Sequence, residues 1–411
     1  MKIKITPHSL HGKVKLPSSK SLTHRALICA SLAMGHSVIN HPLLCDDTMA
    51  TIHCLQQLGV EIKTAEDCIF VNRSKPLQLM GKLDAKDSAS TIRFLIPVIS
   101  TFCNQFSFYG SKRLIERLMT SDIKQLTGLQ FEKQEDCLIV NGKLDYPSLY
   151  LKQEATSQWL SGVLLSLPFV GIPLQCDIEQ DYYTDLTIQM MEHFGINCKK
   201  VERKIISFGS YSPQTVDMEV DYSAMANFLG MAIFSPATKI YSPLRQSLQP
   251  DFRIFSFLEA MGVSFLREEE WISCQGNTLH ETSYSLAKNP DLAPILAAVA
   301  SVSGQTIRIW GLDFLQYKES NRLDAISEAL TMLGARIEKS KDSLLIYGKK
   351  TLLGGVRIPD YQDHRIIMSL IAISSQIDKP FILEGGEAIN KSFPDFYKLF
   401  ASLGGQYESC I

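Results

Sequence analysis

The strongest constraint on the fold is a segment pattern that occurs six times along the chain. In each copy an amphipathic stretch ends at a glycine, and a short strand-like run follows. Such a regular spacing, here about 70 residues, is typical of a repeated supersecondary unit. Glycine fits this position because the residue after a helix often adopts the left-handed conformation. The copies are CLQQLGVEI, IKQLTGLQF, MMEHFGINC, FLEAMGVSF, ALTMLGARI and KLFASLGGQY, with the glycines Gly59, Gly128, Gly195, Gly262, Gly334 and Gly404.

Five copies continue into a polar turn and an alternating apolar run, which predicts a β-hairpin. These tails are AEDCIFVN, QEDCLIVN, ERKIISFG, EEEWISCQ and KDSLLIYG. Helix ends of this kind also arise by chance in α/β proteins, but six at near-constant spacing favour a true repeat. Three repeats on each side give two similar α/β domains of about 200 residues, with a polar, extended crossing near Pro213 to Asp221. A cleft between two such halves is a usual place for a small-molecule site.

Composition excludes several classes of protein. The 411 residues include 41 Lys and Arg against 43 Asp and Glu, and this balance argues against a general nucleic-acid binder. No apolar stretch reaches about 18 residues and no signal-peptide core is present, so we expect a cytoplasmic protein without a membrane partner. The ten cysteines are scattered without a CxxC spacing, which predicts reduced, mostly buried thiols and no metal site.

Two segments of the first half place polar residues where an apolar helix begins. LPSSKSLTHRA puts Lys20, Ser21 and Arg25 at or just inside a helix start, where backbone N–H groups and the helix dipole favour phosphate or carboxylate. DAKDSASTIRFLIP places small residues from Ser88 to Thr91 before another helix, so that backbone amides can approach a ligand closely. The alternatives are a solvated charged face for the first segment and a simple helix cap for the second.

Two further segments of this half carry the same kind of pattern. GSKRLIERLM supplies Arg113 and Arg117 on one face of a helix, although a solvated charge run explains them equally well. QEATSQWLSG places Thr156, Ser157 and Gln158 ahead of an apolar helix, where hydroxyl groups can bind an anion or only cap the helix.

The second half repeats the design with more charge. Asp291 precedes a nearly all-apolar helix that must be buried, so its carboxylate either caps that helix or acts as a base with a perturbed pKa. Each of the other charged groups alone is weak evidence for an anion-binding site, because ion pairs on helix surfaces are common. Together, six polar helix starts that meet at one cleft would bind a multiply charged small anion. The further charged residues at these helix starts are Lys318, Glu319, Arg322, Asp363, His364, Arg365 and Lys391.

Six segments, in order and spread over the whole chain, resemble the signatures of the EPSP synthase family: PSSKSLTHRA, STIRFL, TSQWL, YKESNRL, DHRIIM and KSFPDF. The resemblance implies an α/β fold of two similar domains, each an inside-out α/β barrel of three βαβαββ repeats, with the active site in the cleft between them. It assigns residues 1–18 and 220–411 to one domain and residues 19–219 to the other. We also expect a stand-alone, monomeric enzyme.

The same resemblance implies transfer of the enolpyruvyl group of phosphoenolpyruvate to the 5-hydroxyl of shikimate 3-phosphate, with release of phosphate. This is a step of aromatic amino-acid biosynthesis that needs no metal or organic cofactor. Asp291 would accept the hydroxyl proton, and Glu319 or Lys20 would protonate phosphoenolpyruvate. The residues implied for shikimate 3-phosphate are Lys20, Ser21, Arg25, Thr156, Ser157, Gln158, Asp291 and Lys318. Those implied for phosphoenolpyruvate are Lys20, Ala89, Arg113, Gln158, Arg322, Arg365 and Lys391.

Some positions depart from the family pattern. Asp87, Ser88, Ala89 and Ser90 replace the usual Asn-Ala-Gly-Thr, Gln180 replaces a serine, and Asn321 replaces an aspartate. The methyl group of Ala89 predicts tolerance of glyphosate, the inhibitor that occupies the phosphoenolpyruvate site of this family. The departures leave open a non-catalytic paralogue that binds a phosphorylated metabolite. The sister transferase that acts on UDP-N-acetylglucosamine is a second alternative, but its reactive cysteine is missing from the loop GSKRLIER.

Overall fold

The computed structural model describes residues 1–120, 122–152, 157–177, 182–243, 246–275 and 279–410. The chain divides into two compact units. Ser18–Glu219 forms the continuous unit, whereas Met1–Pro17 and Val220–Ile411 together form the discontinuous unit. These limits lie within one residue of the domain limits expected from the sequence.

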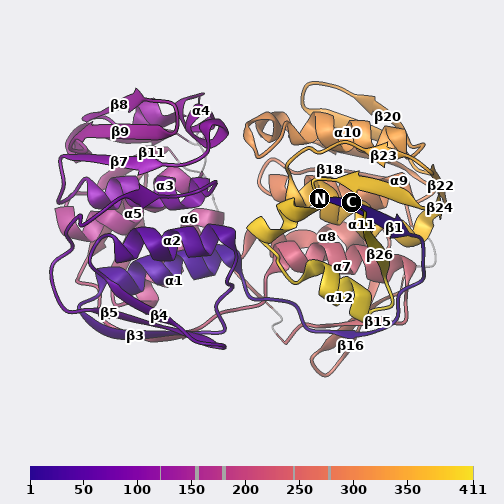
Figure 1. The fold of residues 1–411 in the computed structure, drawn as a ribbon, viewed down its shortest axis with the longest axis horizontal. Coiled ribbons are helices and arrows are strands. Elements are labelled where there is room, and N and C mark those ends of the chain that lie inside the picture. Colours follow the sequence, from indigo (N-terminus) through magenta and orange to yellow (C-terminus); the bar gives the residue numbers. More distant parts are fainter. Residues whose placement is uncertain (121, 153–156, 178–181, 244–245, 276–278, 411) are drawn as a thin grey trace. The chain divides into compact units, whose positions relative to one another are not determined.

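Within the described residues, six four-stranded sheets share one topology. In each sheet one edge strand is parallel to its neighbour, and the other two strand pairs are antiparallel. In the order β6-β7-β9-β8, for example, β6 and β7 are parallel, whereas β7 and β9, and β9 and β8, are antiparallel. The last two strands are the hairpin that the sequence pattern predicts in five repeats. The second, third and fifth repeats follow the order βαβαββ along the chain (Figure 1).

Three of the sheets take a strand from a distant part of the chain. β14 (Thr215–Asp217) pairs with β3 (Gly35–Asn40) and completes the first sheet of the continuous unit. β2 (Gly12–Val14) pairs with β15 (Thr238–Tyr241) in the discontinuous unit. The sixth repeat has no hairpin tail, and β1 (Lys2–Thr6) fills the missing place between two other strands.

The remaining strands have the following bounds. In the continuous unit they are β4 (Glu61–Thr64), β5 (Cys68–Arg73), β6 (Leu83–Asp84), β7 (Gln105–Tyr109), β8 (Leu129–Lys133), β9 (Cys137–Gly142), β10 (Tyr150–Lys152), β11 (Leu174–Asp177), β12 (Asn197–Val201) and β13 (Lys204–Phe208). In the discontinuous unit they are β16 (Ser264–Glu268), β17 (Trp271–Gln275), β18 (Thr282–Ser285), β19 (Thr306–Trp310), β20 (Arg336–Lys339), β21 (Ser343–Tyr347), β22 (Leu352–Gly354), β23 (Arg357–Ile358), β24 (Ile377–Lys379), β25 (Phe381–Glu384) and β26 (Gln406–Cys410).

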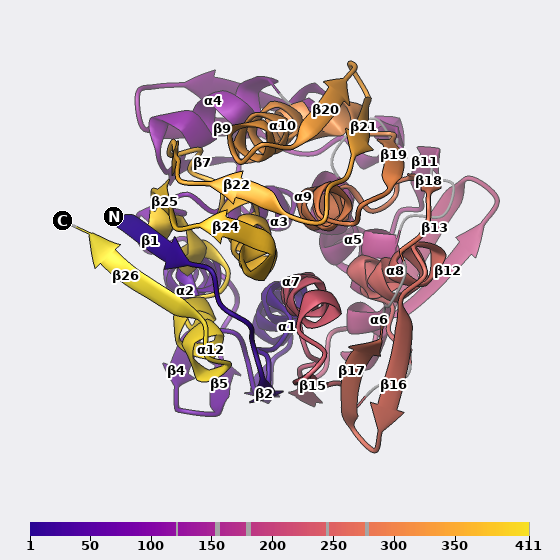
Figure 2. The same cartoon turned by 90° about the vertical axis from the view of Figure 1, so that its right-hand side faces the viewer.

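The first helix of each repeat is buried and the second is amphipathic. Every residue of α9 (Ala293–Ser301) is buried, as its apolar sequence predicts. Figure 2 shows the strands of the discontinuous unit around the outside of α7 and α9. The helices of the continuous unit are α1 (Lys20–Leu32), α2 (Asp46–Gln56), α3 (Ala89–Ile99), α4 (Lys112–Thr120), α5 (Ser157–Val170) and α6 (Tyr182–His193). The other helices of the discontinuous unit are α7 (Tyr222–Phe234), α8 (Ile254–Ala260), α10 (Arg322–Met332), α11 (His364–Ala372) and α12 (Phe396–Ser402).

Short 3-10 helices precede or follow several of these elements: η1 (Asp122–Gln125), η2 (Tyr146–Ser148), η3 (Pro250–Arg253), η4 (Pro290–Leu292), η5 (Asp313–Tyr317), η6 (Ser374–Gln376) and η7 (Gly386–Lys391). The glycine of each repeat has a φ between 85° and 99°, in the region that penalises a β-carbon. Five of these glycines lead the chain into the hairpin of their repeat, as predicted, and Gly404 leads it into β26.

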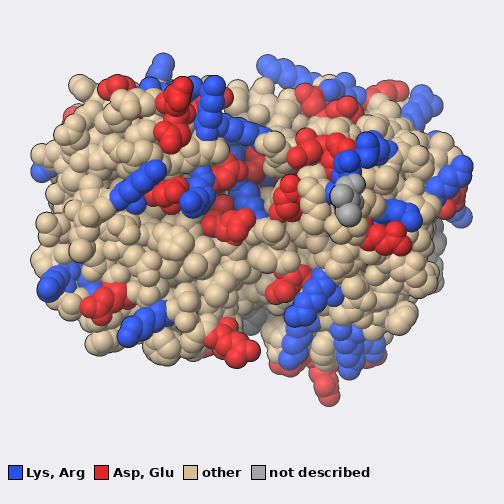
Figure 3. All heavy atoms as spheres, in the orientation of Figure 1, with Lys and Arg blue, Asp and Glu red and all other residues tan. Residues whose placement is uncertain are grey.

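Each unit has its own apolar core. Among the described residues, no helix combines the length and the apolar character that crossing a membrane requires. On the face drawn in Figure 3, acidic and basic side chains are interspersed, in keeping with the near-zero net charge.

Candidate active site

In the continuous unit, a lysine stands at the start of a buried helix. Ser19 caps α1, because its side chain accepts a hydrogen bond from the backbone N–H of Leu22. Lys20 is therefore the first helical residue, and its Nζ donates to Asp47 Oδ2 at 2.9 Å. The carboxylate of Asp47 is only 6% exposed, so the ion pair joins the starts of α1 and α2 in a largely buried place. A cation held at two helix starts is well suited to bind phosphate.

Arg25 lies one turn further along α1 and is buried. Its Nε donates to Thr187 Oγ1 at 2.8 Å, and its Nη2 donates to Ser161 Oγ at 3.0 Å. The guanidinium also lies over the ring of Phe94, 5.0 Å from its centroid. Only 2% of Arg25 is exposed, so these contacts fix it between three helices. Its predicted contact with shikimate 3-phosphate stays a prediction.

A second set of bonds joins the starts of α3 and α5. Arg93 Nη1 donates to Gln158 Oε1 at 2.7 Å, and Gln158 Nε2 donates to Ser90 Oγ at 3.0 Å. Gln158 is thus held by both of its polar atoms. The starts of α3 and α5, two of the predicted anion-binding segments, therefore lie next to each other within this unit.

In the discontinuous unit, a carboxylate is surrounded by cations, and we call this group the Asp291 cluster. Asp291 lies in η4, immediately before α9, and its Oδ1 accepts from Arg322 Nη1 at 2.7 Å and lies 3.1 Å from Lys318 Nζ. Its Oδ2 accepts from Arg365 Nη2 at 3.3 Å. The members of the cluster are Asp291, Lys318, Glu319, Arg322, Asp363, Arg365, Ser223 and Asp251.

Arg322 is the centre of this cluster. Its side chain is 2% exposed and binds three carboxylates at once: Asp291, Glu319 and Asp363. The bond from Arg322 Nε to Asp363 Oδ2 measures 2.8 Å, and Asp363 is fully buried. Asp363 also caps α11 by accepting from the backbone N–H of Arg365 at 3.0 Å. The helix starts of α9, α10 and α11 are therefore joined by charge-assisted hydrogen bonds.

Arg365 extends the cluster to α7 and η3. Its Nη2 donates to Ser223 Oγ at 3.2 Å, and its Nη1 lies 3.7 Å from Asp251 Oδ2. Ser223 in turn donates to Asp251. Arg365 thus lies between two carboxylates, those of Asp251 and Asp291, and keeps 12% of its side chain exposed.

The two carboxylates beside Arg365 have opposite pKa shifts. Burial opposes the ionisation of Asp291, but Arg365, Lys318 and Arg322 outweigh it and hold the pKa of Asp291 well below its ordinary value. Burial raises the pKa of Asp251 to about 6, because Arg365 only partly offsets burial and the neighbouring Asp291 charge. Asp291 is therefore ionised at neutral pH, whereas the pKa of Asp251, about 6, lies close to neutral pH.

The positions of four further predicted site residues are as follows. Arg113 is exposed at the second residue of α4, and Lys391 is partly buried at the end of η7. Ser157 begins α5, and Ser21 is the second residue of α1. The binding roles of these four residues stay predictions. Thr156 and Gln180 lie outside the described residues.

The sequence reasoning missed two carboxylates and a serine of these groups: Asp47, Asp251 and Ser223. The two acids are the second residues of α2 and η3, in the first turn, where an acidic residue is usually read as a response to the helix dipole. Their partners Lys20 and Arg365 are distant in sequence, so no local pattern could have revealed the pairs.

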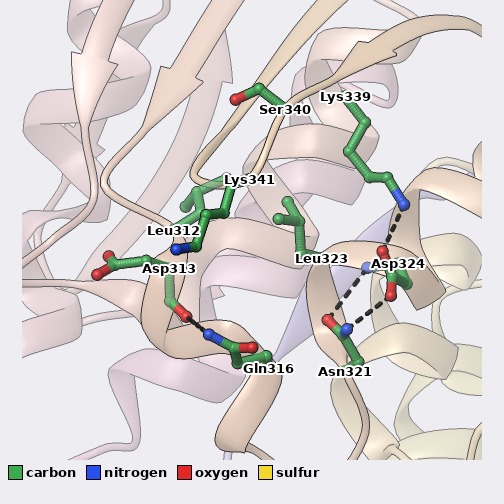
Figure 4. A pocket seen from close by; sticks show the side chains of 9 residues that line it. All are labelled: Leu312, Asp313, Gln316, Asn321, Leu323, Asp324, Lys339, Ser340 and Lys341. Carbon is green, nitrogen blue, oxygen red and sulfur yellow. Dashed lines mark hydrogen bonds and ion pairs between the residues drawn. The ribbon is translucent and has the colours of Figure 1, made fainter.

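A pocket near α10 does not contain the cluster. Its volume is about 380 Å³, and Figure 4 shows polar side chains of η5, α10 and the turn between β20 and β21 around it. Asn321 lines this pocket and caps α10, where its Nδ2 donates to Asp324 Oδ2 at 2.6 Å. None of the Asp291 cluster lines it, so we do not assign this pocket to the substrates.

Comparison with solved structures identifies the fold. The chain superimposes on an EPSP synthase from Acinetobacter baumannii with a TM-score of 0.81, at 21% identity and covering 99% of both chains. It superimposes on the enolpyruvyl transferase NikO from Streptomyces tendae with a TM-score of 0.79, at 13% identity and covering 99% of this chain and 98% of that one. The fold is that of the enolpyruvyl transferases.

Sequence comparison then identifies the family. The family model described as EPSP synthase (3-phosphoshikimate 1-carboxyvinyltransferase) matches residues 5–400. The 3-phosphoshikimate 1-carboxyvinyltransferase of Clostridium kluyveri is 34% identical over 418 residues, which cover 99% of this chain and 98% of the relative. That of Clostridioides difficile is 35% identical over 428 residues, covering 99% and 98%. The chain belongs to the EPSP synthase family.

This membership confirms the predicted family, fold class and carboxyvinyltransferase activity. It does not favour the two alternatives, a transferase specific for UDP-N-acetylglucosamine and a non-catalytic paralogue.

Proposed function

We propose that the chain transfers the enolpyruvyl group of phosphoenolpyruvate to the 5-hydroxyl of shikimate 3-phosphate, and that both units contribute to the reaction. The Asp291 cluster supports this proposal most strongly, because three cations surround one ionised carboxylate where buried helices begin. Cations in this arrangement suit the phosphate and the carboxylate of phosphoenolpyruvate. In the other unit, Lys20 would bind a phosphate at the start of α1.

Each proton and bond of the reaction has a proposed partner. A proton from Glu319 or Lys20 adds to the methylene carbon of phosphoenolpyruvate, and the 5-hydroxyl oxygen attacks the neighbouring cationic carbon. Asp291 accepts the hydroxyl proton in this step. The tetrahedral adduct then loses phosphate and a methyl proton, which regenerates the double bond. No step requires a metal ion or an organic cofactor.

The low pKa of Asp291 has a consequence for this mechanism. A carboxylate that three cations stabilise is a weak base, because its protonated form is disfavoured. Phosphoenolpyruvate would bring negative charges to Lys318, Arg322 and Arg365, and these charges would compete with Asp291 for the same cations. We therefore expect substrate binding to raise the pKa of Asp291 toward the range in which it can accept a proton.

Substitution of Asp291 tests the proposal. Asp291→Ala should leave shikimate 3-phosphate binding measurable and should lower kcat by at least about a hundredfold, the scale of losing a general base. Phosphate release in the presence of both substrates measures kcat, and calorimetry measures binding. The exposed Asp378 in β24 offers a control, since Asp378→Asn should change neither. A kcat within a few-fold of the wild type would remove Asp291 from this role.

We also propose that the enzyme works as a monomer in the cytoplasm, because a single chain supplies all the residues assigned to the site. Light scattering coupled to size-exclusion chromatography checks the oligomeric state. A dimer at assay concentrations would contradict the proposal.

A further inference from the structure

A chain of buried hydrogen bonds crosses three helices of the continuous unit. His24 Nδ1 of α1 lies 2.8 Å from Thr51 Oγ1 of α2, which lies 2.7 Å from Thr91 Oγ1 of α3. Thr91 Oγ1 donates to Ser88 Oγ at 2.8 Å, and Ser88 is the N-cap residue of α3. All four residues are at most 1% exposed. We call these residues the relay.

The hydrogen-bond directions assign one tautomer to the histidine. Because each hydroxyl group has a single proton, the bond from Thr91 to Ser88 requires Thr51 to donate to Thr91. His24 must then donate its Nδ1 proton to Thr51, which leaves Nε2 as an acceptor. Among the residues that the structure describes, this buried atom has no hydrogen-bond partner. A second ring proton would have no acceptor. Burial, opposed only in part by Asp47, lowers the pKa of His24 to about 3, so the ring stays neutral.

The relay lies directly behind residues assigned to the substrates. His24 is one turn after Lys20 on the same face of α1, and Thr51 is one turn after Asp47 on the same face of α2. The two helices are thus joined twice, by the Lys20–Asp47 ion pair and by the His24–Thr51 hydrogen bond. At the other end, the relay fixes the residue that precedes Ala89 and Ser90.

The hydrogen bonds between α1, α2 and α3 are directional, whereas apolar packing is not. The core around α1 and α3 is apolar and includes Phe94 of α3, and apolar contacts of this kind are not directional. Hydrogen bonds between buried hydroxyl groups favour one arrangement, since a rotation of α3 would leave these hydroxyl groups unpaired.

We propose that Thr51 and Thr91, oriented by His24, are positioning residues that hold the start of α3 in register with Lys20 and so set the affinity for phosphoenolpyruvate. This inference rests on the proposed roles of Lys20 and Ala89. The relay residues touch no substrate themselves, and their effect passes through Ser88 to the backbone N–H groups at the start of α3.

Valine and serine substitutions separate the hydroxyl group from the rest of threonine. Thr51→Val keeps the shape of the side chain and removes the hydroxyl, and it should raise KM for phosphoenolpyruvate about tenfold, which corresponds to ~1.4 kcal/mol. KM for shikimate 3-phosphate should change less than about twofold. Thr51→Ser keeps the hydroxyl and should stay near the wild type. Thr101→Val removes a hydroxyl beyond the opposite end of α3, where it donates to Val98 O, and should change neither constant.

A double-mutant cycle tests whether the hydroxyl groups act as one chain. Thr91→Val should have an effect similar to that of Thr51→Val, and the double variant should be little worse than either single variant. Additive effects, equal rises in both KM values, or a loss of thermal stability with unchanged kinetics would each overturn the proposal. Should Thr51→Val not fold, Thr91→Val with its partner Thr91→Ser decides the question.

The relay can fail while the proposed site stands. If Ser90→Ala raises KM for phosphoenolpyruvate and neither valine variant does, the start of α3 binds the substrate without the help of the relay. If Lys20→Met and Ser90→Ala both leave this KM unchanged, the assignment of the site itself is wrong.

Discussion

Ala89 is the first residue of α3, and only 3% of it is exposed. A methyl group beside a closely fitted ligand typically costs about 1–3 kcal/mol, which corresponds to roughly a five- to hundredfold loss of affinity. Glyphosate is longer than phosphoenolpyruvate and should lose more. We therefore expect Ala89→Gly to lower the inhibition constant of glyphosate by a factor in this range, measured against the wild type at equal phosphoenolpyruvate saturation. Equal constants would mean that the methyl group faces the core.

Asp251 should make the stability of the protein depend on pH. Its pKa is raised to about 6 by burial, so the native state binds this proton more tightly than the unfolded state does. The resulting stabilisation is complete below the ordinary pKa of an aspartate and is lost as the pH rises through about 6. The groups that face the carboxylate are Arg365, Ser223, Asp291 and Asp221, of which the two acids raise its pKa further.

Asp251→Asn removes this titration. The melting temperature of the variant, relative to that of the wild type, should rise by several degrees between pH 5 and pH 8, on a scale of about 2–4 °C per kcal/mol. Thermal unfolding over this pH range measures the difference, and Asp378→Asn provides the control at an exposed site. Parallel curves for the wild type and Asp251→Asn would contradict the raised pKa.

The residues that the sequence identified are those with a local signature. Arg322 and Arg365 follow polar turns at helix starts, and Asp291 precedes an all-apolar helix, so their positions were readable from the chain. Asp47 and Asp251 were not, because their importance comes from partners brought close only by the fold. Thr51 and the other relay residues could not be identified from the sequence either, because their hydrogen bonds form only when α1, α2 and α3 pack together.

At the scale of elements, the repeat glycines differ in what surrounds them. A β-carbon on Gly128 would lie 2.2 Å from the carbonyl oxygen of Lys143, whereas one on Gly59 would first meet the sulfur atom of Met80 at 3.3 Å. Both glycines have a positive φ, of 85° and 86°. The backbone oxygen beside Gly128 cannot move aside easily, but the methionine side chain can.

Alanine substitutions at these two glycines should therefore have unequal effects. Gly59→Ala should lower the free energy of unfolding by about 1–2 kcal/mol, the penalty of the left-handed conformation alone. Gly128→Ala adds a clash with the backbone and should lower it by more than about 3 kcal/mol. Urea unfolding of the two variants measures both values. Equal losses would show that conformation alone matters at this position.

The sequence predicted the hairpins and helix ends well because both depend on local patterns. It did not predict which strands complete the sheets. β1, β2 and β14 each pair with strands that are distant along the chain. The alternation of apolar residues predicts a strand, but it does not specify the partner of that strand. The missing hairpin tail of the sixth repeat was one hint that a strand must come from elsewhere, and the family resemblance, which placed residues 1–18 with residues 220–411, was another.

At the scale of the whole molecule, the two units should differ in their ability to fold alone. All strands of the three sheets of the continuous unit lie within Ser18–Glu219, so this fragment carries a complete core. Residues 220–411 lack β1 and β2, and β1 is an interior strand between β25 and β26. We expect the fragment 18–219 to unfold cooperatively in a thermal melt and the fragment 220–411 to show no such transition.

A permuted fragment provides the matched control. Lys2 pairs directly with Cys410, so a linker of about four residues can join the end of residues 220–411 to the start of residues 1–17. This permuted fragment should regain a cooperative transition. Cooperative unfolding of residues 220–411 alone would show that β1 is dispensable.

The interior position of β1 also determines when the protein can finish folding as it leaves the ribosome. The amino-terminal strand emerges first, yet both of its neighbours belong to the last part of the chain to be made. The continuous unit can complete its sheets as soon as β14 emerges, while β1 waits through most of translation with its backbone unpaired. Alternating apolar side chains on an unpaired strand invite association with other chains. β1 therefore stays unpaired for longer than the strands of the continuous unit, all of whose partners lie within Ser18–Glu219.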